Sequence, residues 1–225
     1  MDKAKSKDVY LRAGLPTPRS VTVQANEAAI DYDSIVETVG EHCVVKASSE
    51  GSSLGLYMVE RAEDLPAALE QAFMLSNHVV VETFITGSEF TCVVVGNEDL
   101  HVFPVIQIVP ANDFYDFDAK YAPGGSRHLC PAPLSDEVTQ RLQQCAVNAH
   151  RALECAGVSR TDFIVDENDD CWLLETNTIP GMTATSLLPD AARAAGMSFP
   201  EICTELVKLA IERHESEASR RSAMA

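Results

Sequence analysis

Four polar residues near the carboxyl end have the types and spacing of a cation-binding hairpin: Arg160, Asp162, Glu175 and Asn177. A hairpin turn centred between residues 168 and 169 places Asp162 opposite Glu175. The same register places Arg160 opposite Asn177, so that all four side chains share one face. Two carboxylates facing each other across a ladder repel unless something neutralises them, and Mg²⁺ takes oxygen ligands from one or two carboxylates. The pattern indicates a magnesium site; the alternative is an exposed polar sheet face paired through Arg160.

A second candidate is the segment SSEGSSLG, residues 48–55, between two short β-branched runs. Small residues let backbone N–H groups approach an anion closely, and the hydroxyls of Ser52 and Ser53 add donors. Lys46, just before the segment, can place its ammonium group on a phosphate. No Gly-Lys-Ser/Thr follows, so this is not a Walker loop. A phosphate-covering loop and a plain surface hairpin both fit the pattern.

A third candidate is the long segment 110–133, which contains FYDFDAKYAPGG with Lys120 and Tyr121. Loops of this length are usually functional, and an aromatic loop with one cation suits a lid over a polyphosphate. A packed Ω-loop is the alternative. Glu82 and Glu89 flank the expected junction of two lobes, where a carboxylate can accept from an amino group or a ribose hydroxyl. Either glutamate alone is equally typical of a solvated side chain.

The elements that position these residues alternate between strand and helix patterns. Helices are expected at 3–13, 27–39, 65–75, 135–157, 185–195 and 199–214, and strands at 20–23, 43–46, 56–59, 79–85, 89–95, 102–109 and both arms of 160–177. The core-facing side of the last hairpin is expected to carry Phe163, Val165, Trp172 and Leu174. The fold class is therefore α+β, with a cleft between two lobes. We expect lobes at residues 1–85 and 86–214, followed by a frayed tail at 215–225.

The composition narrows the possible partners and the compartment. The 34 acidic residues against 17 Lys and Arg, a formal charge of −17, argue against binding a nucleic acid backbone, although a few placed cations still permit ATP binding. The seven cysteines include no C-x-x-C pair, which is typical of reduced thiols in the cytoplasm. No stretch approaches the ~18 apolar residues of a membrane span, so a cytoplasmic protein without membrane contact is expected.

Several segments together resemble the D-alanine–D-alanine ligase family. MDKAKSK, GLPTP, VVKASSEGSSLG, VVVETFITGSEFT, FYDFDAKY, CPAPL, SRTDFIVD and LLETNTIPGMTATSLLP have the order and spacing of that family, over about residues 1 to 212. The resemblance implies an ATP-grasp fold, in which two lobes with antiparallel sheets and flanking helices sandwich ATP. The activity it implies is ATP-dependent ligation of two D-alanines through an acyl phosphate, for peptidoglycan precursor synthesis.

The resemblance also implies a role for each matching residue. Lys3 and Lys46 resemble the lysines on the ATP phosphates, and Ser52 and Ser53 the covering loop. Glu82 is similar to the acceptor of the adenine amino group, with the backbone of Phe84 and Ile85 completing the base site, while Glu89 matches the ribose ligand. Lys120 resembles the lysine that moves with the lid. Asp162, Glu175 and Asn177 match the ligands of two Mg²⁺ ions, with Mn²⁺ as a substitute. Arg160 and the Gly181 amide match the groups that stabilise the tetrahedral intermediate, and Ser186 and Leu187 the pocket for the second D-alanine carboxylate.

Three further expectations follow from the resemblance. Tyr121 after Lys120 is the family's pattern for D-alanine as second substrate, and Ala47 stands where a proline is common. Family members carry an amino-terminal domain before the MDK segment, which supplies part of the first D-alanine site. We therefore expect a separate amino-terminal domain or a homo-oligomer as partner. A Mg-ATP-binding fragment with little ligase activity of its own is the alternative function.

Overall fold

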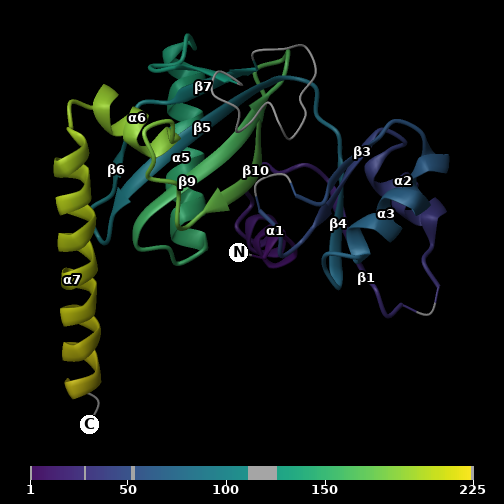
Figure 1. Ribbon diagram of the computed structural model, residues 1–225, viewed down its shortest axis with the longest axis horizontal. Coiled ribbons are helices and arrows are strands. Elements are labelled where there is room, and N and C mark those ends of the chain that lie inside the picture. Colours follow the sequence, from purple (N-terminus) through teal and green to yellow (C-terminus); the bar gives the residue numbers. More distant parts are fainter. Residues whose placement is uncertain (1, 28, 52–53, 111–125, 224–225) are drawn as a thin grey trace.

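The computed structural model describes residues 2–27, 29–51, 54–110 and 126–223, and its helices and strands form two lobes (Figure 1). The smaller lobe contains a four-stranded sheet in the order β1-β4-β2-β3, in which all neighbours are antiparallel. Its elements are β1 (Ser20–Gln24), α2 (Tyr32–Val39), β2 (Cys43–Ala47), β3 (Leu56–Val59), a 3₁₀ turn η1 (Ala62–Asp64), α3 (Leu65–Phe73) and β4 (His78–Thr83).

The larger lobe is built on a six-stranded antiparallel sheet in the order β10-β9-β5-β7-β8, with β6 paired to β5. Its elements are β5 (Ser88–Gly96), β6 (His101–Val102), β7 (Ile106–Pro110), β8 (Ser126–Leu129), α5 (Asp136–Ala152), β9 (Gly157–Val165), β10 (Cys171–Asn177), α6 (Leu187–Ala194) and α7 (Phe199–Ala223). The expected α+β class is thereby confirmed.

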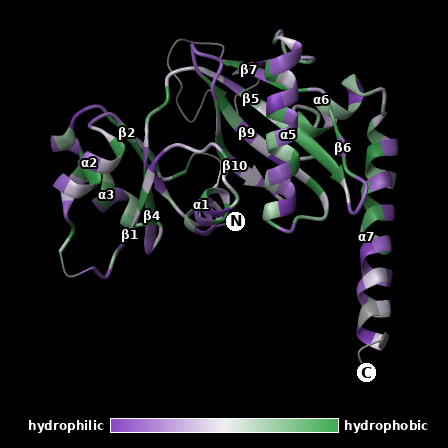
Figure 2. Ribbon diagram, turned by 180° about the vertical axis from the view of Figure 1, so that it is seen from behind, coloured by the Kyte–Doolittle hydropathy of each residue, from purple (hydrophilic) through white to green (hydrophobic). Residues whose placement is uncertain are grey.

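The central strand β5 shows how the larger sheet divides its two faces. Because side chains alternate along a strand, Cys92 and Val94 join the core under α5, while Val93 and Val95 join the core under α6 and α7. Figure 2 shows α5 lying across one face of this sheet. Thr91 lies on the same face as Val93 and is paired with Asp162 of the predicted site.

Helices α2 and α3 cover one face of the smaller sheet. Val45, Val79 and Val81 pack beneath α2 and α3. The residues that alternate with them on β2 and β4, among them Lys46 and Glu82, therefore lie on the opposite face. That face is turned toward α1.

Helix α1 (Lys3–Arg12) lies between the two sheets, as both ribbon views show (Figures 1 and 2). The Asp2 side chain caps it by accepting a hydrogen bond from the Lys5 amide. Tyr10 and Leu15 are buried in the core of the larger lobe. The chain passes from one sheet to the other between Thr83 and Ser88. The lobe boundary at residue 85 stays a prediction, because α1 precedes that boundary in the sequence but packs into the core of the larger lobe.

Two element boundaries differ from the sequence-based expectations because of capping. The second helix starts at Tyr32 rather than near residue 27, since Asp31 accepts from the Ser34 amide and serves as its N-cap. Helix α5 starts after Ser135 as expected but ends at Ala152 rather than at Gly157. Gly157 has a positive φ of 73° and begins β9 instead.

Three further differences concern longer-range structure. The strand expected over 102–109 is divided into β6 and β7 on either side of Pro104, which lacks an amide hydrogen for the ladder. The segment 110–133 contains the strand β8, which pairs with β7. The predicted frayed tail is helical up to Ala223. Arg213 and Glu217, one turn apart on this helix, form an ion pair. No helix among the described residues is long and apolar enough to cross a membrane.

Candidate active site

The hairpin of β9 and β10 has the predicted register at its open end. Glu175 is opposite Asp162, and Asn177 is opposite Arg160. All four side chains lie on one face, and Thr91 of β5 continues that face beside Asp162. The spacing of the four polar residues was therefore a sufficient signal for their convergence.

A β-bulge shifts the register of the same hairpin nearer its turn. Between Leu173 and Glu175 the pairing slips by one residue, so that Leu173 is fully buried in the core beneath α5 while Glu175 points to the site. The prediction that Trp172 and Leu174 face the core is wrong for this reason: both are half-buried, and Cys171 and Leu173 join Phe163 and Val165 in the core. The alternation rule fails here because a bulge adds one residue to one strand only.

Asp162 is held by the strongest contacts of the site. Its oxygens accept from Arg160 Nε at 2.9 Å and Nη2 at 2.8 Å, and Oδ1 also accepts from Thr91 Oγ1 at 2.6 Å. Burial opposes the charge on Arg160, but the neighbouring carboxylates of Asp162, Glu175 and Glu89 outweigh it and raise the pKa of the guanidinium. Arg160 is therefore a fixed cation in the site.

Asn177 connects the two carboxylates expected to bind a metal. Its Nδ2 donates to Asp162 Oδ2 at 3.2 Å and to Glu175 Oε1 at 3.3 Å, so the three side chains converge on one point. Among the described residues no three His, Cys, Asp or Glu side chains form a metal-binding group; the third member here is an amide, whose nitrogen faces both carboxylates. Two carboxylates fit a hard divalent cation such as Mg²⁺, and a half-turn of the Asn177 amide would present its oxygen as a third ligand.

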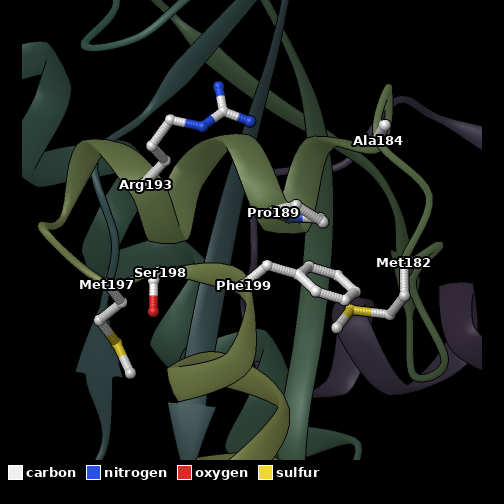
Figure 3. A pocket seen from close by; sticks show the side chains of 7 residues that line it. All are labelled: Met182, Ala184, Pro189, Arg193, Met197, Ser198 and Phe199. Carbon is white, nitrogen blue, oxygen red and sulfur yellow. The ribbon is translucent and has the colours of Figure 1, made fainter.

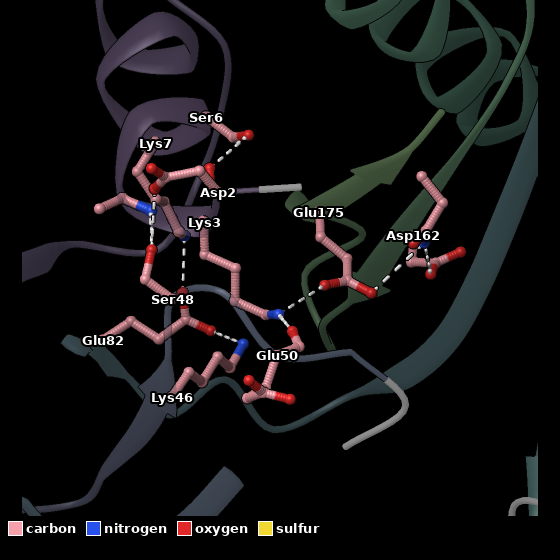
Figure 4. Close-up of polar contacts among 12 residues, drawn as sticks. Asp2, Lys3, Ser6, Lys7, Lys46, Ser48, Glu50, Glu82, Asp162 and Glu175 are labelled. Atoms are coloured by element: carbon pink, nitrogen blue, oxygen red, sulfur yellow. Dashed lines mark hydrogen bonds and ion pairs between the residues drawn. The ribbon is translucent and has the colours of Figure 1, made fainter. Parts of the chain in front are cut away.

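Lysines reach the same region from α1 and the smaller lobe (Figure 4). Lys3 Nζ lies 3.6 Å from Glu175 Oε2 and also donates to the carbonyl oxygen of Glu50, at the start of the Gly/Ser segment. Lys46 donates to Glu82 Oε1 across the neighbouring strands β2 and β4. The structure therefore brings the two predicted phosphate-binding lysines into one group of polar contacts (Figure 4).

Glu82 is almost completely buried, with 2% of its side chain exposed, and Lys7 is its second partner at 2.7 Å. Burial disfavours the charged carboxylate, but Lys46 and Lys7 together outweigh burial and lower the pKa of Glu82. Lys7 was not predicted. Its position one helical turn after Lys3 is the signal that would have found it, because residues i and i+4 share a helix face.

The predicted base-binding segment follows directly on β4. The Phe84 ring stacks on His42 with centroids 4.0 Å apart, and the Phe84 amide donates to the His42 carbonyl at 3.2 Å. Ile85 is half-buried and leads toward Glu89, which lies on the same face of β5 as Thr91. The roles proposed for Phe84, Ile85 and Glu89 stay predictions.

Gly181 and Ser186 lie in contact in the loop between β10 and α6. A Cβ atom on Gly181 would come within 2.8 Å of Ser186 Oγ. That oxygen accepts from the Thr183 amide at 2.9 Å, and Leu187 begins α6 directly afterwards. The free amides at a helix N-terminus favour an anion, which is consistent with a carboxylate pocket here.

Four predicted site residues lie outside the described part of the chain: Ser52, Ser53, Lys120 and Tyr121. Their roles therefore stay predictions.

A separate depression of about 510 Å³ lies between α6 and the start of α7 (Figure 3). It is lined by Met182, Ala184, Pro189, Arg193, Met197, Ser198 and Phe199. None of the predicted site residues lines it. The predicted site residues therefore gather in the cation and carboxylate cluster and not in this apolar hollow.

Two lobes with antiparallel sheets, one carrying the pair of Lys46 and Glu82 and the other the polar group around Asp162, form a nucleotide-binding architecture of the ATP-grasp type. Residues 9–208 match the family described as D-ala D-ala ligase C-terminus. The D-alanine–D-alanine ligase of Syntrophobacter fumaroxidans is 45% identical over 214 residues, covering 94% of this chain and 68% of that protein.

Two solved structures have the same fold. The D-alanine–D-alanine ligase from Coxiella burnetii gives a TM-score of 0.87 at 28% identity, covering 99% of this chain and 60% of that one. The enzyme from Bacillus anthracis complexed with ATP gives 0.82 at 26% identity, covering 96% and 67%. The chain belongs to the D-alanine–D-alanine ligase family, and the expected family and ATP-grasp fold are confirmed.

Proposed function

We propose that this chain binds Mg-ATP and catalyses the ATP-dependent joining of two D-alanines to D-alanyl-D-alanine, a peptidoglycan precursor. The observation that carries the proposal is the convergence of Asp162, Glu175 and Asn177 on one point, with Lys3 beside them and Lys46 on the facing lobe. Phosphoryl transfer needs little covalent help from a protein and depends on positioning and charge neutralisation. The cluster supplies both.

The reaction proceeds in two steps. The γ-phosphoryl group of ATP moves to the carboxylate of one D-alanine, which forms ADP and an acyl phosphate. The amine of the second D-alanine then attacks the acyl carbon, loses a proton and expels inorganic phosphate. Lys3 and Lys46 bind the phosphates in this proposal, and Glu82, Glu89 and the backbone at 84–85 bind the base and ribose.

The second step needs a site for a developing negative charge. Arg160 is held by two hydrogen bonds to Asp162, and Gly181 lies beside Ser186. We assign the Arg160 guanidinium and the Gly181 amide as donors to the oxygen of the tetrahedral intermediate, where preorganised donors are most effective. Ser186 and Leu187, at the start of α6, hold the carboxylate of the second D-alanine.

Asp162, Glu175 and Asn177 would hold Mg²⁺, two ions by the family resemblance, or Mn²⁺. When bound, the metal neutralises charge on the β- and γ-phosphates. The Bacillus anthracis relative in complex with ATP supports the nucleotide, and the names of the relatives support D-alanine as the substrate.

The test is phosphate release by the purified chain with ATP and D-alanine, with ATP alone as control and dipeptide detected by mass spectrometry. We expect phosphate and D-alanyl-D-alanine in equal amounts, and loss of both in Asp162→Asn. Asp64→Asn serves as the matched control, because Asp64 is an exposed carboxylate in η1 of the smaller lobe and belongs to none of the predicted sites. ATP binding without dipeptide would favour the alternative of a fragment that only binds nucleotide. The absence of both ATP binding and turnover would refute the proposal.

A further inference from the structure

One carboxylate in the smaller lobe has two lysine partners. Glu82 Oε2 lies 2.7 Å from Lys7 Nζ, and Glu82 Oε1 accepts from Lys46 (Figure 4). The side chains of Lys7 and Glu82 are 5% and 2% exposed, and that of Lys46 is 13% exposed. Two ammonium groups on one carboxylate leave a net charge of +1, which is the sign that a phosphate needs.

The two lysines differ in how firmly they are held. Lys7 Nζ also donates to Thr17 Oγ1 at 2.6 Å, and that hydroxyl donates to the Leu173 carbonyl of β10 at 2.8 Å. Thr17 and Leu173 are both buried, so Lys7 is anchored to the larger lobe. Within the described residues, Glu82 is the one ion-pair partner found for Lys46.

This difference matters when a phosphate competes for Lys46. A lysine that turns to a phosphate must leave Glu82, and a buried carboxylate that loses its last counter-ion is strongly destabilised. The anchored Lys7 removes that obstacle, because Glu82 stays paired whichever way Lys46 points. Burial disfavours the charged form of Lys7 and lowers its pKa, while Glu82 acts in the opposite direction.

We propose that Lys7 is a positioning residue, the permanent counter-ion of Glu82, which frees Lys46 to bind the phosphates of a nucleoside triphosphate. The inference rests on the proposed function, since it requires that Lys46 binds phosphate. Lys7 itself touches no reacting atom. It acts through Glu82 on the availability of Lys46.

The experiment compares Lys7→Met with Lys5→Met, an exposed lysine on the same helix whose side chain is 85% exposed. Calorimetry measures the affinity of each full chain for Mg-ATP and for adenosine. Lys7→Met should weaken Mg-ATP binding by roughly 10- to 100-fold, the effect of one hydrogen bond to a charged group. Adenosine binding, which involves no phosphate, should change little, and Lys5→Met should match the parent chain.

The double variant Lys7→Met with Glu82→Gln separates positioning from mere structural support. A neutral residue at 82 no longer holds Lys46, so the affinity for Mg-ATP relative to adenosine should recover most of what Lys7→Met loses. The ratio is compared because Glu82 is also assigned to the base, and a change at the base affects both ligands. Equal losses for ATP and adenosine, or no recovery in the double variant, overturn the proposal. If the parent chain binds no Mg-ATP, the proposed function fails and this inference fails with it. If the parent chain and the Lys7→Met variant bind Mg-ATP equally well, only the inference is refuted.

Folding of the variants is checked by circular dichroism. If Lys7→Met does not fold, Thr17→Val is used instead, because it removes the anchor of Lys7 and leaves all three charges in place. A selective loss of Mg-ATP affinity relative to adenosine is again expected, and unchanged Mg-ATP affinity overturns the proposal.

Discussion

The pair of Arg160 and Asp162 permits a sharp test of the electrostatics of the site. Arg160→Met removes two charge-assisted hydrogen bonds, at 2.9 and 2.8 Å, from a carboxylate whose side chain is only 10% exposed. Breaking a buried ion pair by removing one partner costs about 3 to 5 kcal/mol. Thr91 and Asn177 still donate to Asp162, so we expect the lower value, about 3 kcal/mol.

For a chain of 225 residues, a loss of about 3 kcal/mol lowers the Tm by roughly 6 to 12 °C. The exposed pair of Arg61 and Asp64, whose side chains are 66% and 49% exposed, provides the control. Arg61→Met should cost less than about 1 kcal/mol, because water screens an exposed pair. Thermal unfolding followed by circular dichroism measures both changes.

Magnesium should discriminate further between the variants. In Arg160→Met the carboxylates of Asp162 and Glu175 lose their nearest guanidinium, so a divalent cation gains more by binding between them. Millimolar MgCl₂ should therefore raise the Tm of Arg160→Met more than that of the parent chain. A Tm for Arg160→Met within the range of Arg61→Met, or a magnesium effect no larger than in the parent chain, would refute this account of the site.

Three further outcomes are expected. Lys46→Met should weaken Mg-ATP binding by roughly 10- to 100-fold in calorimetry, and unchanged affinity would contradict its assignment to phosphate. The lowered pKa of Glu82 means that its stabilising contribution is complete above its ordinary value of 4.5 and is lost as the pH falls below it; acid unfolding of Glu82→Gln should therefore be less steep with pH in that range. Gly181→Ala places a Cβ within 2.8 Å of Ser186 Oγ, so the KM for D-alanine should rise while the Kd for ATP, measured separately, stays constant.

The sequence predicted local pairing better than it predicted longer-range structure. The hairpin of β2 and β3 and the open end of the β9 and β10 hairpin follow from alternation and turn residues, which act over a few positions. The bulge near Leu174 does not follow from alternation. The one extra residue lets Leu173 face the core while Glu175 faces the site, and strict alternation would place these two residues on the same face. Strand β8 was missed because short edge strands carry a weak pattern of their own and depend on the neighbouring strand.

The candidate site was predicted in part. Asp162, Glu175, Arg160 and Asn177 were found from spacing alone, since they share one hairpin. Roles such as that of Gly181 came only from the family resemblance, because a glycine has no chemistry that spacing can show. Lys7 was missed because its partner Glu82 is distant in sequence and its other partner, Thr17, has no obvious ligand role. Only the packing of α1 between the lobes brings the three residues together.

The ion pairs of the site follow one rule: a cation expected to meet a phosphate or an oxyanion is paired with a carboxylate expected to meet a metal or the base. Lys3 pairs with Glu175, Lys46 with Glu82, and Arg160 with Asp162. Mg-ATP brings both charges at once. At the pair of Lys3 and Glu175 the metal can bind the carboxylate while a phosphate binds the lysine, and at the pair of Lys46 and Glu82 the second lysine, Lys7, keeps the carboxylate neutralised when Lys46 turns to a phosphate. Neither partner is then left buried and unpaired, which is the outcome that would be costly. Binding of ATP and magnesium should therefore be mutually dependent, since each alone would leave unpaired charges of one sign.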